Sequence, residues 1–139
     1  MKRLKKTTER LLTDPLHAIV GLDLVATGLI LLFNRHYFFW PPQPEIVTAI
    51  LNDSVVGFIG VCLGLGMIAW ALSHSRPAVV DHWIITLSTA YYTIIAMTEL
   101  AHAFFGRGGF RGYMAMDAMS DLIMVGIALY MAQNSNSKD

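Results

Sequence analysis

Four long apolar stretches, separated by segments rich in proline, glycine or arginine, dominate this sequence. A helix needs about 20 apolar residues to cross a bilayer, and each stretch reaches that length. The 139-residue chain is 55% hydrophobic and 14% charged, which is too apolar for an ordinary soluble domain. We therefore predict an all-α integral membrane four-helix bundle, a single domain with transmembrane helices at about 16–38, 46–72, 81–105 and 112–132.

Lysine and arginine counts predict the topology. With the amino terminus inside, seven of these residues fall on the cytoplasmic side and three on the other. They are Lys2, Arg3, Lys5, Lys6, Arg10, Arg76 and Lys138, against Arg35, Arg107 and Arg111. The positive-inside rule then places both termini in the cytoplasm. Residues 1–13 form a basic cytoplasmic tail, and 133–139 form a polar tail. The first apolar stretch runs on into aromatic residues instead of a cleavage site, so we predict a retained span.

Several classes of protein are excluded by composition and motifs. The formal net charge is zero, which leaves no electrostatic basis for a nucleic-acid partner. The single cysteine, Cys62, permits neither a disulfide framework nor a thiolate metal site within one chain. No hydrolase, zinc-protease or redox motif is present. An enzyme is therefore the lesser hypothesis, and we expect no cofactor.

Local signals predict where two of the helices begin. Asp14 followed by Pro15 is typical of an amino-terminal cap with proline at the first helical position. Asp81, which follows the Arg76-Pro77 turn, is predicted to cap the third helix. Within that helix three threonines share a side, from which they would bond either to a neighbouring helix or to their own preceding turn. These are Thr86, Thr89 and Thr93.

Small residues mark a packing face on the second helix. Gly60 and Gly64 form a GxxxG pair, and Gly57 and Ala71 extend the same line. Small residues let helix backbones approach closely in a membrane, where apolar burial does not drive association. The sequence leaves open whether the partner is another helix of this chain or a second copy.

Ionisable residues inside the predicted spans are the candidate functional groups. Asp23 lies in the first span, Glu99 and His102 form a Glu-x-x-His pair in the third, and Asp117 and Asp121 stand one turn apart in the fourth. Charged groups at membrane depth are costly, so they are expected to face the bundle interior. The antiparallel hairpin places the last four groups in the same half of the membrane.

Three interpretations of this polar network stay open. Glu99, His102, Asp117 and Asp121 are weak candidates for a metal site, which would suit a hard divalent ion. Together with Asp23 they would alternatively form a proton or cation pathway. In the third, leading interpretation, the acids pair with Arg107 and Arg111 and only hold the hairpin together.

We predict a small multi-pass protein of a bacterial-type plasma membrane, acting as an oligomeric bundle or as an accessory subunit of a membrane assembly. Its expected partners are the lipid bilayer and either copies of itself or another membrane protein. The alternative is a proton or cation conduit, or a holin-like membrane-permeabilising protein. The layout, four spans with no soluble domain, is typical of small bacterial and phage membrane proteins, holins among them.

Overall fold

Four helices make up the computed structural model, which describes residues 15–34, 50, 53–73, 75, 77–106 and 109–135. The helices are α2 (Pro15–Phe33), α4 (Ser54–Leu72), α5 (Ala78–Phe105) and α6 (Gly112–Ser135). All four are long and apolar enough to cross a membrane. The predicted all-helical architecture with four candidate spans is thus confirmed. The basic tail at 1–13 lies outside the described residues.

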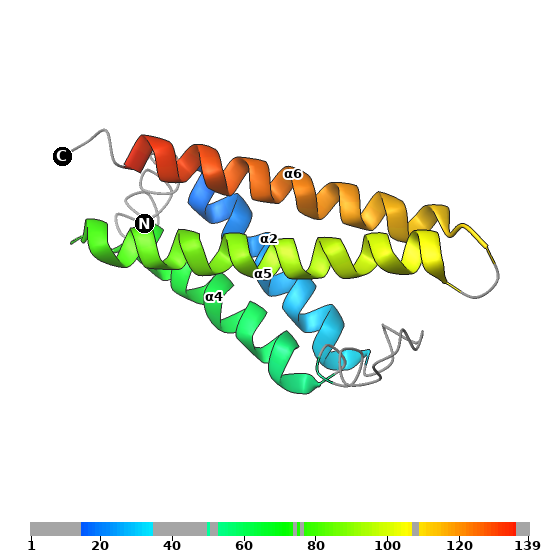
Figure 1. The fold of residues 1–139 in the computed structure, drawn as a ribbon. Coiled ribbons are helices and arrows are strands. Elements are labelled where there is room, and N and C mark those ends of the chain that lie inside the picture. Colours follow the sequence, from blue (N-terminus) through cyan, green and yellow to red (C-terminus); the bar gives the residue numbers. More distant parts are fainter. Residues whose placement is uncertain are drawn as a thin grey trace.

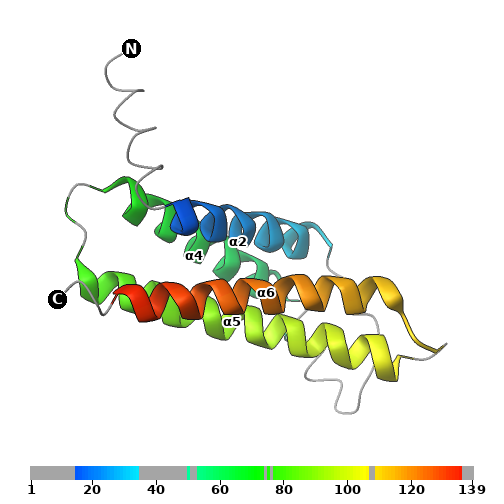
Figure 2. The ribbon, with the colours of Figure 1, turned by 90° about the horizontal axis from the view of Figure 1, so that it is seen from above.

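The helices pack as two hairpins. α2 lies against α4 and α5 lies against α6, with fewer contacts between the two pairs. Figure 1 shows that the pairs cross at an angle, and in Figure 2 α2 and α4 lie on one side of α5 and α6. α2 begins at the same end of the bundle at which α6 finishes (Figure 1). We call this the first end, and the end with the α5–α6 turn the second end.

Buried residues recur at alternating spacings of three and four along the helices. In α2 this stripe is His17, Gly21, Leu24, Gly28 and Leu31. In α4 it is Gly57, Gly60, Gly64, Met67 and Ala71. In α5 it is Asp81, Ile85, Ser88, Tyr92, Ile95, Glu99 and His102. Alternation of three and four is the spacing of coiled-coil packing. Each of these helices therefore turns one narrow stripe inward and leaves many large apolar side chains exposed, as a lipid environment requires.

Glycines bring the backbones of α2 and α4 into contact. A methyl group built on Gly28 would lie 2.6 Å from the carbonyl oxygen of Gly57, and one on Gly64 would lie 2.5 Å from the carbonyl oxygen of Gly21. The helix that faces Gly57 and Gly64 is thus α2 of the same chain. Gly60 lies at the same contact, but a methyl group there would meet the Tyr91 hydroxyl, at 2.5 Å.

The helix ends agree with the sequence signals only in part. α2 begins at Pro15, as its position after Asp14 predicts. The prediction that Asp81 caps α5 is wrong, because α5 begins at Ala78 and Asp81 lies inside its first turn. Its carboxylate contacts His17 instead. At the other boundaries, α2 ends at Phe33 and α6 continues to Ser135, into the segment predicted as a polar tail.

Candidate functional site

Five polar residues lie on the buried stripe of α5. We call them the polar stripe: Asp81, Ser88, Tyr92, Glu99 and His102. At 1.5 Å per residue the stripe extends for about 32 Å along the helix. The hydrocarbon core of a bilayer is about 30 Å thick. The polar stripe therefore reaches from one end of the bundle to near the other, and the helices beside it add further polar groups.

At the first end, α2 and α5 are joined by a contact between an imidazole and a carboxylate. His17 Nε2 lies 2.8 Å from Asp81 Oδ1, and both side chains are buried. The His17 imidazole also stacks on the Trp70 indole of α4, with ring centroids 4.5 Å apart. Trp70 Nε1 in turn donates to the Pro77 carbonyl oxygen, at 3.3 Å. This cluster thus ties α2, α4 and the beginning of α5 together.

In the middle of the bundle, Tyr92 bridges α5 to α2. Its hydroxyl donates to Asp23 Oδ2 at 2.7 Å and also lies 3.3 Å from the Val20 carbonyl oxygen. Asp121 of α6 is buried and close enough to interact electrostatically with Asp23 and with Tyr92. Three helices therefore place two carboxyl groups and a phenol around one central region.

Toward the second end, Glu99 and His102 are almost fully enclosed. Glu99 is 3% exposed and His102 is 1% exposed. His102 Nδ1 lies 2.8 Å from the Thr98 carbonyl oxygen. Because a carbonyl oxygen can only accept, Nδ1 must carry a proton. In neutral His102 the lone pair is therefore on Nε2, which gives this end of the polar stripe a proton acceptor beside a carboxyl group.

The structure separates the ionisable residues that the sequence grouped together. Glu99, His102 and Asp121 are buried and Asp23 is half-buried, whereas Asp117 is exposed. Asp121 interacts with Asp23 across the bundle as well as with its helical neighbour Asp117. Within the described residues, no group of three or more His, Cys, Asp or Glu side chains gathers where it could hold a metal ion.

The arginines predicted to pair with these acids come between α5 and α6 in the sequence. Arg107 is outside the described residues. The Arg111 side chain folds over the end of α5, where a methyl group on Gly106 would lie 3.4 Å from its Nε atom. The Arg111 backbone nitrogen also donates to the Ala103 carbonyl oxygen, at 3.0 Å. Arg111 thus helps to close the carboxyl end of α5, the position at which a cation favours the helix dipole.

Buried polar residues that were not predicted from the sequence are His17, Ser88 and Tyr91. The inward orientation of Asp81 was not predicted either. The alternating spacing of three and four would have identified most of them, because it continues from Asp81 to His102 through Ser88 and Tyr92. The same spacing in α2 includes His17. Tyr91 lies beside that line and is nevertheless buried, because its hydroxyl reaches the glycine contact of α2 and α4.

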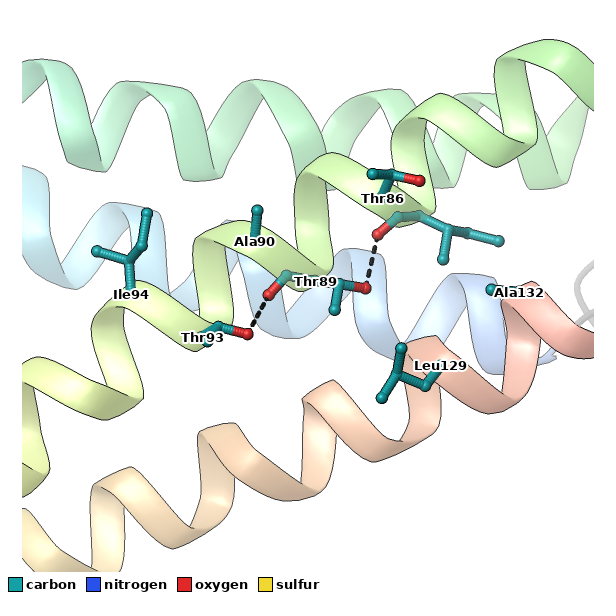
Figure 3. A pocket seen from close by; sticks show the side chains of 8 residues that line it. Thr86, Thr89, Ala90, Thr93, Ile94, Leu129 and Ala132 are labelled. Atoms are coloured by element: carbon teal, nitrogen blue, oxygen red, sulfur yellow. Dashed lines mark hydrogen bonds between the residues drawn. The ribbon is translucent and has the colours of Figure 1, made fainter.

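A groove between α5 and α6 is lined almost entirely by methyl and aliphatic groups (Figure 3). Its volume is about 460 Å³. Thr89 donates to the Ile85 carbonyl oxygen at 2.8 Å and Thr93 to that of Thr89 at 2.7 Å. Thr86 donates in the same way to His82. The three hydroxyls thus bond to their own helix and leave the groove apolar.

Fold and composition together are compatible with a small helical membrane protein. Its four described helices are long and apolar enough to cross a bilayer. Comparison of the chain with family models, with curated proteins and with solved structures finds no match. The buried polar groups of the chain itself are therefore the basis for a proposal about its role.

Proposed function

We propose that this protein conducts protons across a membrane along the polar stripe of α5. The observation that carries the proposal is the burial of titratable groups at both ends and in the middle of the bundle, over about 32 Å of helix. The groups assigned to the pathway are the His17–Asp81 pair, Asp23 with Tyr92, Asp121, and Glu99 with His102. The membrane proposed is a bacterial-type plasma membrane.

Protons suit this interior better than hydrated cations do. Ile85 and Ile95 interrupt the polar stripe, and both are fully enclosed. A hydrated cation needs a continuous polar surface, whereas a proton needs only successive donors and acceptors. Chains of carboxyl and imidazole groups are the proton relays of known pumps and transporters.

Packing alone gives no reason for so many buried polar groups. The glycine contact between α2 and α4 already joins two helices without them. A carboxyl group at the centre of a membrane helix costs about 2.5 to 3.5 kcal/mol on insertion scales. Apolar residues in the same positions would pack at lower cost, which favours a role for the carboxyl groups in transport.

Replacing Glu99 by glutamine is expected to reduce proton flux on the order of a hundredfold, because a positioned proton-transfer group typically contributes about 10² to 10⁴ in rate. Glutamine keeps the shape of the side chain but does not titrate. The flux is measured with a pH-sensitive dye inside liposomes that contain the purified protein, with a potassium diffusion potential as the driving force.

The matched control for this experiment is Asp53→Asn. Asp53 is exposed and caps α4 by accepting a hydrogen bond from the Val55 backbone nitrogen, at 3.0 Å. Asparagine is an equally good cap, so this variant changes a carboxyl to an amide outside the pathway. Flux that falls equally in both variants, or in neither, would contradict the proposal.

A second candidate function is that of a packing subunit, either in a homo-oligomer or in a larger membrane assembly. The observation that favours it is Asp117, whose side chain is exposed within a candidate span. A carboxyl group facing lipid is costly, and a neighbouring protein would cover it. This candidate predicts no proton flux from the purified protein, so the liposome experiment also separates the two functions.

A further inference from the structure

Two buried hydroxyl groups of α5 have no hydrogen-bond partner among the residues that the structure describes. They are Ser88 Oγ and the Tyr91 hydroxyl. Ser88 is 0% exposed and Tyr91 is 7% exposed. Buried hydroxyl groups are almost always satisfied by protein or by bound water, because an unsatisfied one is costly in an apolar interior.

Both hydroxyl groups belong to residues that neighbour Tyr92 along α5. Ser88 precedes Tyr92 by one helical turn, on the same face of α5. Tyr91 adjoins Tyr92, with ring centroids 6.2 Å apart. The Tyr91 hydroxyl reaches Gly60 of α4, next to Gly28 of α2. Asp121 of α6 interacts electrostatically with Tyr91. The Tyr91 hydroxyl of α5 is therefore enclosed at the α2–α4 contact and under the electrostatic influence of α6.

The chemistry of these groups selects water as their ligand. A serine or tyrosine hydroxyl both donates and accepts, which matches a water molecule with two to four polar partners. A divalent cation would need several carboxylate, imidazole or thiolate ligands, and the described residues hold no group of three. An apolar ligand would leave the hydroxyl groups unsatisfied.

We propose that the Ser88 and Tyr91 hydroxyls, together with the Asp121 carboxyl, form an internal water site in the middle of the bundle. Water held there supplies hydrogen-bond donors and acceptors between Ile85 and Ile95, the two isoleucines that interrupt the polar stripe. Its part in proton transfer rests on the proposed function. The water gains an O–H bond as the neighbouring donor loses its bond to that proton, and it then gives up a different proton to the next acceptor. Water is thereby regenerated, and no bond between heavy atoms changes. The binding of water itself does not depend on transport.

Water-edited solid-state NMR of the protein in liposomes tests the site directly. The measured quantity is the rate at which water magnetisation builds up at the Ser88 Cβ and Tyr91 Cζ signals, the latter assigned by its loss in Tyr91→Phe. Ile95 is the internal reference, because it lies one turn from Tyr91 on α5, is 1% exposed and belongs to the hydrophobic core. We expect build-up at Ser88 and Tyr91 several times faster than at Ile95. Equal rates at all three residues would overturn the site.

Proton flux of Ser88→Ala and Tyr91→Phe in the same liposomes tests the relay. Each substitution removes only a hydroxyl group that has no described protein partner, so neither is expected to lower the melting temperature or the folded yield. We expect flux to fall at least tenfold in each variant, while Tyr130→Phe, an exposed tyrosine of α6, leaves it unchanged.

The outcomes separate the two proposals. Unchanged flux in Ser88→Ala and Tyr91→Phe would overturn the relay, even if the NMR experiment detects water. A parent protein without any flux would overturn proton conduction and the relay together, while fast build-up at Ser88 and Tyr91 would still support the water site.

Discussion

Replacing Gly28 by alanine is expected to lower the free energy of unfolding by about 1–3 kcal/mol, the usual cost of overpacking. The added methyl group would lie 2.6 Å from both the carbonyl oxygen of Gly57 and the backbone nitrogen of Val61. Backbone atoms in a helix cannot move individually, so α2 and α4 would have to separate along their length. The loss should therefore lie in the upper part of that range. Reversible unfolding in mixed detergent micelles, followed by circular dichroism, measures it.

Gly126→Ala is the matched control for this substitution. Gly126 lies in α6, and a methyl group built there meets nothing within 4 Å. Alanine in a helix is favoured over glycine by about 0.5–1 kcal/mol, so this variant should be as stable as the parent protein or slightly more so. Equal losses in the two variants would show that the α2–α4 contact is not closely packed around Gly28.

The second large effect is expected at the contact between His17 and Asp81. A double-mutant cycle with His17→Phe and Asp81→Ala should give a coupling energy of about 1.5–3 kcal/mol, the range for hydrogen bonds to charged groups. Phenylalanine can still stack on Trp70, so the cycle isolates the 2.8 Å contact between imidazole and carboxylate. The same unfolding measurement supplies the four stabilities.

The His17–Asp81 contact is buried at both partners. It differs in this from exposed ion pairs, whose contribution to stability is commonly below about 1 kcal/mol. A coupling energy near zero would mean that α2 and α5 are not joined at the first end. In that case the His17–Asp81 contact would be removed from the proposed proton pathway as well.

Hydropathy and local signals predicted the helices well, because they depend on composition and on short-range geometry. Four apolar stretches are sufficient to predict four helices, and Pro15 marks the first residue of α2. Asp81 was misplaced because an aspartate after a proline turn is typical of a cap, whereas here three residues of α5 precede it. The packing partner of Gly57 and Gly64 was left open, since a glycine face does not reveal which helix approaches it.

The candidate site was predicted less completely than the helices. Asp117 and Asp121 share an i,i+4 spacing, but only Asp121 is buried in the bundle. Asp121 of α6 interacts electrostatically with Asp23 of α2, and these two helices belong to the two hairpins that cross (Figure 1). That crossing depends on how side chains such as Tyr92 fill the space between the pairs, and hydropathy does not contain this information. The Tyr91 hydroxyl beside Gly60 depends on the same crossing.

The most direct test of proton conduction is the membrane potential of cells that express this chain, read with a voltage-sensitive dye beside cells that express Asp121→Asn at the same level in the membrane. Asp121 is the buried carboxyl group of α6 that interacts electrostatically with Asp23 and with the tyrosines of α5. Proton conduction along the polar stripe predicts depolarisation by the parent protein and a normal potential with the variant. Equal depolarisation by both proteins, or a normal potential with both, would contradict it.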